Sequence, residues 1–316
     1  MRSVTHRNLV TAVAAFSCSI IPLAISPAHG ETPLSGNAGV KKVLPGGSVS
    51  GRGGKFQLAD GERDRWTSKI LANPKDPKNY VGRAKDYMLL CEDEKALADF
   101  STALSLDPHN REALHERILL LGDLGRKEEA LRDCNTLIKA YPKSTFGYEH
   151  RCIVYQSMQK LKEALADTDA ALKIEPNAVT VWQYRCSIFI NQGDSAGALK
   201  CLTRLTELSP DNSTNFSVRA NYYVKRKEYS KAIADLTQTI KLRQGEFEPF
   251  IMRADVYKEM KEYKKAIADY TRAIEMNRFR AGYAYKGRGE CYKALGDSAA
   301  AERDFVQSKS GEKVYR

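Results

Sequence analysis

Five prolines recur at a fixed interval of 34 residues, and this period constrains the fold more than any other feature of the chain. They are Pro74, Pro108, Pro142, Pro176 and Pro210. A proline at the same place in each period indicates that a helical unit ends there. Self-similarity at such a spacing is the signature of stacked helical hairpins. The sequence therefore predicts an all-α chain built from repeats.

Three further positions keep the same register as the prolines. The first is an aromatic residue or leucine on the first helix of each unit: Tyr80, Leu114, Tyr148, Trp182, Phe216, Phe250 and, after one inserted residue, Tyr285. The second lies seven residues later: Tyr87, Leu121, Tyr155, Phe189, Tyr223, Tyr257 and Tyr292. The third is an alanine on the second helix: Ala96, Ala130, Ala164, Ala198, Ala232, Ala266 and Ala301. Because residues seven apart share a helix face, the first helices carry a continuous packing stripe.

This pattern resembles that of the tetratricopeptide repeat family, W-x2-L-G-x2-Y followed by A-x3-F and P. The resemblance covers about residues 77–314 and implies an all-α, right-handed superhelical solenoid of about seven helix–turn–helix repeats. The repeats expected are 77–110, 111–144, 145–178, 179–212, 213–246, 247–281 and 282–314. Because a solenoid grows in one dimension, the length of 316 residues does not require two globular domains.

One departure from the family pattern is systematic, because arginine replaces the leucine in every repeat. The arginines are Arg83, Arg117, Arg151, Arg185, Arg219, Arg253 and Arg288. An aspartate stands sixteen residues after six of them: Asp99, Asp133, Asp167, Asp235, Asp269 and Asp304. Since partly buried charges need partners, we expect an Arg–Asp pair that braces each hairpin. The fourth repeat has Cys201 instead, which leaves Arg185 either paired elsewhere or free for an acidic ligand.

The residues before the repeats indicate export. Residues 1–30 have the layout of a secretory signal peptide, in which Arg2 and Arg7 precede an apolar run and small residues precede a cleavage site before Glu31. The alternative is an uncleaved membrane anchor, although the apolar run is short and contains Pro22. We expect cleavage and a periplasmic or secreted location, with no transmembrane span in the mature chain.

The two flanks of the repeats differ in composition from the repeats themselves. Residues 31–56 are rich in glycine and have no periodic apolar face, so they predict a flexible linker. Residues 57–76 predict one helix with Trp66 and Ile70 on a common face, which we interpret as an N-terminal capping helix. At the other end the last two repeats lack the proline and the tail is polar. The last hairpin therefore either frays or meets a partner.

The formal net charge of +11 is concentrated toward the C-terminal end. Residues 219–316 carry 22 lysines and arginines against 14 aspartates and glutamates, an excess of +8. Such an imbalance indicates either attraction to an anionic partner or a well-solvated face. The lysines of residues 258–265 are interspersed with glutamates, which favours solvation. Nucleic acid is disfavoured because basic and aromatic residues do not interleave.

No motif for catalysis stands in the repeats. A serine nucleophile elbow, a P-loop and a phosphate-binding glycine loop are all missing, so we predict no enzyme and no cofactor. His115 and His150 lack a carboxylate pattern, and no Cys–His spacing suggests a metal site. Several cysteines stand at packing positions, where the thiol behaves as a small apolar group. A disulfide is left open, with Cys186 and Cys201 the best-placed pair because they share one hairpin.

The resemblance implies that the first helices line a concave groove for an extended peptide or a partner helix. The residues that match the groove positions are Glu112, His115, Leu119, Phe146, Glu149, Ile153, Gln183, Ser187, Asn191, Ser217, Asn221, Lys225, Ile251, Asp255 and Lys258. Ile190 lies beside them. We expect its apolar side chain, with those of Phe146 and Ile153, to face water beside the amides of Gln183, Asn191 and Asn221.

A ligand explains exposed side chains of that kind better than folding does, since amides can hydrogen-bond an extended backbone whatever its sequence. The family's clamp for a C-terminal carboxylate is not expected, because Ser217 stands where it needs lysine. The function predicted is a non-enzymatic protein-interaction scaffold whose partner is a protein or peptide. The alternative is a module that binds an anionic envelope polymer, a membrane surface or nucleic acid through the basic C-terminal repeats. A solvated inner face on a scaffold that only sets spacing is the remaining interpretation.

Overall fold

The computed structural model describes residues 60–277 and 281–310, and within these ranges it has fifteen α-helices and no strand. The predicted signal peptide and linker lie outside the described residues. The all-α repeat fold expected from the sequence is confirmed. The chain divides after Pro142 into two compact units, which we describe separately.

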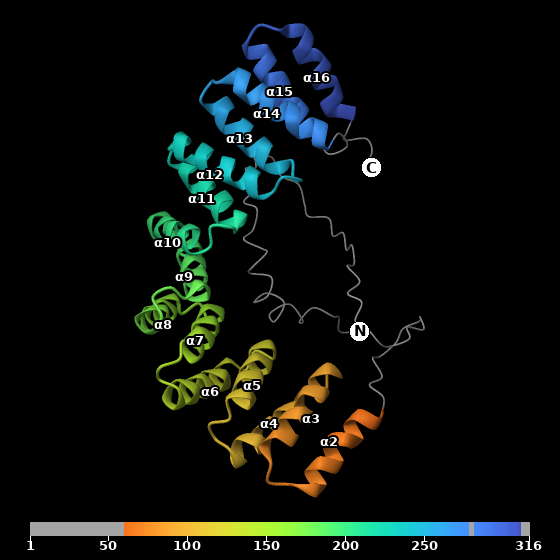
Figure 1. The fold of residues 1–316 in the computed structure, drawn as a ribbon, viewed down its shortest axis with the longest axis vertical. Helices are drawn as coiled ribbons and strands as arrows, with labels where there is room; N and C mark the ends of the chain where they lie inside the picture. Colours follow the sequence, from red (N-terminus) through yellow and green to blue (C-terminus); the bar gives the residue numbers. More distant parts are fainter. Residues whose placement is uncertain (1–59, 278–280, 311–316) are drawn as a thin grey trace. The chain divides into compact units, whose positions relative to one another are not determined.

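The first unit contains five helices, and Figure 1 shows them in orange to yellow. Their bounds are α2 Asp60–Ala72, α3 Pro77–Leu89, α4 Asp93–Leu106, α5 Arg111–Asp123 and α6 Lys127–Ala140. Helices α3 and α4 form one antiparallel hairpin and α5 and α6 the next, and α4 packs against α5. Helix α2 packs against α3 before the first hairpin.

The second unit contains five hairpins in succession (Figure 1). The bounds of their helices are α7 Phe146–Ser157, α8 Leu161–Ile174, α9 Val179–Asn191, α10 Ser195–Leu208, α11 Ser213–Lys225, α12 Tyr229–Leu242, α13 Glu248–Glu259, α14 Tyr263–Met276, α15 Gly282–Ala294 and α16 Ser298–Ser310. Each odd-numbered helix packs against the even-numbered helix that follows it and against the one that precedes it within the unit.

Every hairpin turns through one residue in the left-handed backbone conformation. The seven residues are Cys91, Gly125, Gln159, Gly193, Lys227, Lys261 and Gly296, with φ between 59° and 85°. The next residue donates its backbone N–H to the carbonyl five residues back, as from Glu228 to Tyr223 at 2.8 Å and from Asp297 to Tyr292 at 3.0 Å. This is the Schellman arrangement, which satisfies the last carbonyls of the first helix. Glycine adopts it without strain, whereas four repeats force a side chain into it.

In two repeats a hydrogen bond joins the recurring proline to the recurring aromatic residue. Trp182 Nε1 donates to the carbonyl of Pro176 at 2.9 Å, and Tyr80 Oη donates to the carbonyl of Pro74 at 3.1 Å. Each proline lies just beyond the end of a second helix, where it cannot continue that helix. In these two repeats the aromatic side chain of the next first helix fixes the loop.

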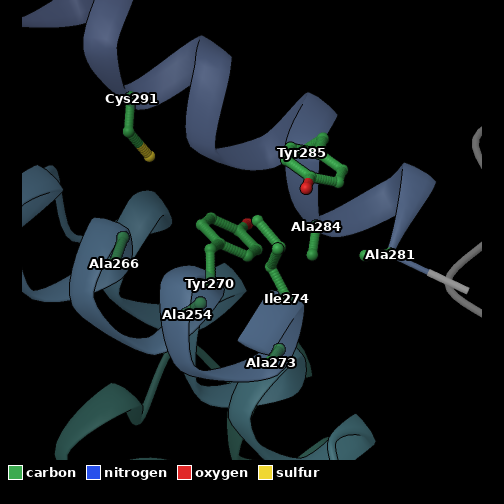
Figure 2. Close-up of a cluster of buried hydrophobic side chains, with 9 residues drawn as sticks. All are labelled: Ala254, Ala266, Tyr270, Ala273, Ile274, Ala281, Ala284, Tyr285 and Cys291. Atoms are coloured by element: carbon green, nitrogen blue, oxygen red, sulfur yellow. The ribbon is translucent and has the colours of Figure 1, made fainter. Parts of the chain in front are cut away.

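Small residues allow the helices of each hairpin to pack closely. The repeated alanine of the second helix is at most 3% exposed at every one of its seven positions. Around α13, α14 and α15 a cluster of buried side chains has Tyr270 at its centre (Figure 2). A Cβ atom added at Gly287 would lie 2.5 Å from Tyr270 Cζ, so only glycine leaves room for this ring.

The predicted Arg–Asp pair is confirmed in six repeats. In each of them the guanidinium meets both carboxylate oxygens of the aspartate sixteen residues later, as Arg117 does with Asp133 at 2.7 and 2.6 Å. The remaining terminal nitrogen reaches the preceding second helix in several repeats: Arg253 donates to Thr237 at 2.9 Å. One guanidinium therefore holds its own hairpin together and fastens it to its neighbour.

Arg185, whose hairpin lacks the aspartate, is paired elsewhere. It forms an ion pair with Asp169 and donates to Thr168 Oγ1 at 3.0 Å, both on α8 of the preceding hairpin. Cys201 takes the place of the missing aspartate and is buried with Leu202 and Leu205. The alternative that Arg185 is free for an acidic ligand is therefore wrong.

Both ends of the repeats are covered by packed helices. A Cβ atom added at Gly82 of α3 would lie 2.5 Å from Trp66 Cζ2, so the indole of α2 lies flat against that helix. At the C-terminal end α16 continues to Ser310, and Phe305 packs against Gly289 of α15. Of the two alternatives for the last hairpin, fraying does not describe residues 282–310.

Candidate partner-binding face

The predicted groove residues lie on the first helices of the hairpins, on the side that we call the inner face. Three of them, Glu112, His115 and Leu119, lie on α5 in the first unit. The other twelve lie on α7, α9, α11 and α13 in the second unit. The structure therefore places them in two separate groups.

In the first unit, two carboxylates of the inner face are paired with a lysine of the same unit. Lys85 Nζ lies 3.0 Å from a carboxylate oxygen of Glu112 and 3.9 Å from one of Glu116. Burial lowers the pKa of His115, so its imidazole is kept neutral near physiological pH. Neither Glu112 nor His115 presents a strong charge to a ligand.

In the second unit, hydrogen bonds connect the inner faces of α7 and α9. Thr180 Oγ1 donates to Glu149 Oε2 at 3.0 Å, and Ser187 Oγ donates to Gln156 Oε1 at 2.9 Å. Each bond joins residues 31 positions apart, so neighbouring first helices have a constant register. The carboxylate of Glu149 and the hydroxyl of Ser187 are therefore engaged in the fold, and Ser217 likewise donates to the carbonyl of Ser213 at 3.0 Å.

The carboxylate of Asp255 accepts hydrogen bonds within the fold. Tyr270 Oη donates to one of its oxygens and Tyr283 Oη to the other, the latter at 3.2 Å. Burial raises the pKa of Asp255 above its usual range despite these donors. Lys258 is paired with Glu290 at 2.8 Å. The predicted ligand contacts at Asp255 and Lys258 are thus occupied by side chains of the same unit.

The apolar residues predicted to face water are more covered than expected. Phe146, Ile153 and Ile190 are all half-buried. The Phe146 ring meets the His150 ring edge-on with centroids 4.4 Å apart, and Ile190 packs on the cluster formed by Cys186, Cys201 and two leucines. These side chains contribute partly to the hairpin cores, which sequence spacing alone could not reveal.

One exposed apolar residue on the inner face was not identified from the sequence. Leu89, the last residue of α3, is 62% exposed. The six corresponding positions of the later repeats hold polar residues or alanine: Asp123, Ser157, Asn191, Lys225, Glu259 and Ala294. That contrast along the repeats is the signal that could have identified it.

Three amides on α9 and α11 form no hydrogen bond with any described residue. They belong to Gln183, Asn191 and Asn221, and all three are at least partly exposed. The polar side chains beside them, on Ser187 and Ser217, are engaged within the chain. These amides are therefore the inner-face groups that a ligand could bind without breaking a bond in the fold.

Many of the basic residues on the hairpin turns of the second unit are paired. Glu228 meets Arg226 at 2.5 Å and Lys231 at 2.6 Å, and Glu262 meets Lys265. Lys225, Lys227, Lys261 and Lys264 form no ion pair with the described residues, and all are exposed. Lys241, Lys286 and Lys293 on the helices likewise form no ion pair with the described residues, so the unneutralised positive charge is spread over both turns and helices.

Thiols and metal-ligating side chains are the other reactive groups of the described residues. No disulfide joins the cysteines among them, which are Cys91, Cys134, Cys152, Cys186, Cys201 and Cys291. No cluster of three or more histidine, cysteine or acidic residues with metal-binding geometry occurs in the part of the chain that the structure describes. In that same part, none of the helices combines the length and apolar character needed to cross a bilayer.

Residues 248–280, which span α13 and α14, match the family model for the tetratricopeptide repeat. No curated protein matches the chain significantly. Among solved structures, a crystal structure of the MamA protein aligns with 54% of this chain and 92% of its own, at 21% identity and a TM-score of 0.49.

Two other solved structures are similar at the same level of identity. A tetratricopeptide repeat protein from Parabacteroides merdae ATCC 43184 aligns with 72% of this chain and 90% of its own, at 21% identity and a TM-score of 0.47. YrrB, described as a TPR protein with an unusual peptide-binding site, aligns with 58% of this chain and 94% of its own, at 21% identity and a TM-score of 0.44.

The matched repeat has the features that the other hairpins share. Its left-handed turn at Lys261 corresponds to the turns of all the other hairpins, and its pair between Arg253 and Asp269 recurs in five of them. The spacing of the hairpins is the 34-residue period already seen in the sequence. Residues 248–280 therefore form a tetratricopeptide repeat, and the other hairpins share its features.

Proposed function

We propose that this protein is a non-enzymatic interaction scaffold that binds an extended peptide or a partner helix on the inner face of α7, α9 and α11. The observation that carries the proposal is the set of three amides, on Gln183, Asn191 and Asn221, that no described residue binds. An amide side chain offers both donors and an acceptor. It can therefore pair with the backbone of an extended chain whatever the side chains of that chain are.

Few of the predicted groove residues on this face are charged. On α7, α9 and α11 they are Glu149, which accepts a hydrogen bond from Thr180, and Lys225 at the end of α11. The half-buried side chains of Phe146 and Ile153 add apolar area beside the amides. Binding here relies on hydrogen bonds and apolar contact, so its affinity changes little with ionic strength.

The rigidity of the hairpins lowers the cost of binding. Arg219 holds its own hairpin through Asp235 and meets Thr206 of the preceding one at 2.6 Å. Because the recognition side chains stand on helices that are already packed, little backbone entropy is lost when a ligand binds.

Export belongs to the same proposal: the signal-like residues 1–30 favour action outside the cytoplasm.

A selection from a displayed library of random twelve-residue peptides tests the proposal. The bait is the full chain, and each bound peptide is measured again on the triple variant Gln183→Ala, Asn191→Ala, Asn221→Ala. Three lost hydrogen bonds predict that affinity falls by about tenfold or more. The matched control is Gln244→Ala, which removes an exposed amide from the loop before α13 and leaves affinity unchanged.

Salt separates this function from the basic-surface alternative. Peptides that bind equally in low and high salt and are lost in the triple variant support the scaffold. Anionic ligands that bind only in low salt, and equally well to the triple variant, would replace it with recognition by the lysines of the turns.

A further inference from the structure

The inner face of the first unit combines an exposed leucine with open space. Leu89 ends α3 and is 62% exposed. On α5, a Cβ atom added at Gly122 would meet nothing within 4 Å. Leu119, one turn before Gly122, is half-buried. An apolar side chain and an unfilled position therefore occur on the same face of two packed helices.

The register between α3 and α5 brings these residues together. Lys85 contacts Glu112 and Glu116, which lie 27 and 31 positions later. The same offset of 31 joins α7 to α9 in the second unit. Applied to Leu89, these offsets point to residues 116–120 of α5. Leu89 is therefore level with the turn of α5 that precedes Gly122.

Two carboxylates lie next to this apolar spot. Asp93 begins α4, four residues after Leu89, and Asp123 ends α5, directly after Gly122. Burial raises the pKa of Asp123, and the like charge of Asp93 raises it further. Neither aspartate forms an ion pair with any described residue.

Two cations of the adjoining turns are engaged with other carboxylates. Lys95 meets Glu92 at 2.8 Å, and Arg126 meets Glu129 at 2.6 Å and Glu94 at 3.5 Å. The two aspartates therefore leave a net negative charge beside Leu89. A positive group brought there would relieve their mutual repulsion.

We propose that this spot binds a peptide in which an apolar side chain, placed over Gly122 and against Leu89, is flanked by lysine or arginine that meets Asp93 and Asp123. The inference rests on the proposed scaffold function and specifies its ligand in the first unit. Acidic peptides are excluded by repulsion from the two aspartates. A purely apolar peptide binds more weakly, since it leaves these charges unneutralised.

The test uses the same displayed peptide library with a second set of variants of the full chain. Leu89→Ser removes the apolar contact, and Gly122→Gln fills the open space with a side chain that favours the helix. Leu71→Ser is the matched control, because Leu71 on α2 is 79% exposed and outside the proposed spot. The pair Asp93→Asn, Asp123→Asn removes the charge while keeping the size of both side chains.

The expected result is enrichment of peptides with an apolar residue beside lysine or arginine. Their affinity falls about tenfold with Leu89→Ser or Gly122→Gln and stays unchanged with Leu71→Ser. The double aspartate variant lowers their affinity in low salt and removes its dependence on salt. Circular dichroism of each variant verifies that the helices are retained.

Other outcomes overturn the inference and are distinguishable from failure of the scaffold function. If the enriched peptides are lost in the triple amide variant of α9 and α11 but bind normally to Leu89→Ser, the scaffold stands and the spot at Leu89 is not used. Enrichment of acidic peptides, or of basic peptides indifferent to Leu89→Ser, also contradicts the inference. If the selection enriches no peptide, both the scaffold function and the inference about Leu89 are contradicted.

Discussion

Arg219 holds Asp235 with two parallel hydrogen bonds, at 2.8 Å from Nε and 2.7 Å from Nη2. The aspartate side chain is 6% exposed and that of the arginine 15%. The phenol rings and phenyl rings at the two recurring aromatic positions cover the guanidinium, as Phe216 and Tyr223 do here with centroids 5.7 and 5.8 Å from Cζ. Removing one partner of such a buried pair costs free energy, because the other charge is left without a partner.

Removing one partner of that pair should therefore destabilise the second unit strongly. Asp235→Ala leaves a largely buried guanidinium without its carboxylate, and we expect the free energy of unfolding to fall by about 3 kcal/mol. Asp169→Ala is the control, because Asp169 has an exposed side chain and its pair with Arg185 is worth at most about 1 kcal/mol. Urea denaturation followed by circular dichroism measures both. Equal losses for the two variants would contradict a special role for the buried pairs.

The fourth repeat should accept the aspartate that it lacks. Cys201→Asp places a carboxylate where six other repeats have one, opposite Arg185. We expect this substitution to be tolerated with Arg185 present and to cost at least about 1 kcal/mol more in the Arg185→Met background. A double-mutant cycle in urea gives this coupling energy. A coupling near zero would mean that Arg185 stays with Asp169.

The hairpin turns predict opposite effects for substitutions that involve glycine. Lys227 has φ 59°, so Lys227→Gly relieves backbone strain and should raise the free energy of unfolding by up to about 1 kcal/mol. Gly193 has φ 71°, so Gly193→Ala should lower it by about 1 kcal/mol. Gly122→Ala, inside a helix with open space at the Cβ position, is the control and should stabilise. Thermal melts of the three variants test whether their stabilities change in these directions.

The sequence was sufficient for the hairpins and for most of their bracing. The period of 34 residues fixes which helix follows which, and two helices of one hairpin have a constant register, so an aspartate sixteen residues after each arginine could be paired with it in advance. The partner of Arg185 depends on the register between hairpins. Asp169 stands sixteen residues before Arg185, where Arg117 and Arg253 have Ser101 and Thr237, and that comparison would have identified it.

The candidate face was harder to predict because it depends on the size of single side chains. Asp255 matches a groove position, yet a tyrosine on α14 is long enough to reach its carboxylate, and Gly287 makes room for that tyrosine. Leu89 falls on a groove position that the later repeats fill with polar residues or alanine, and its exposure in the folded chain gives that contrast its meaning. Family positions specify a face, whereas the residues of this chain decide which part of it is free.

The buried cysteines predict loss of stability at high pH. Burial raises the pKa of Cys152 and of Cys186 to about 12, and that of Cys201 and Cys291 to about 11. The native chain therefore keeps these protons when the unfolded chain, with a thiol pKa near 9, has lost them. The stability that they provide is present below pH about 9 and is lost as pH rises toward 11 to 12.

Thermal melts of the chain and of a Cys152→Ala, Cys186→Ala variant between pH 8 and 10.5 test this. We expect the melting temperature of the unmodified chain to fall more steeply across that range. Iodoacetamide labelling at pH 8 gives a second measurement, in which exposed Cys91 reacts and the buried thiols do not until the chain is denatured. Rapid labelling of Cys152 in the folded chain would contradict the burial argument.

Asp255 predicts a stabilising substitution inside the candidate face. Its pKa is raised by burial, so the folded chain holds the proton more tightly than the unfolded chain does. The contribution of this group is therefore favourable below its unfolded pKa, near 3.8, and is lost as pH rises through the folded value. At neutral pH the chain carries the cost of a desolvated carboxylate.

Asp255→Asn removes that charge and keeps an oxygen that can accept from Tyr270. We expect the variant to be more stable than the unmodified chain at pH 7, because it has no desolvated negative charge there. The advantage should shrink as the pH is lowered toward 4, where the unmodified carboxyl takes up its proton. Urea denaturation at pH 4, 5.5 and 7 measures it, with Glu259→Gln as a control for an exposed carboxylate of the same helix. A variant that is less stable at pH 7 would contradict this expectation. It would show that the two tyrosine donors require Asp255 to be ionised.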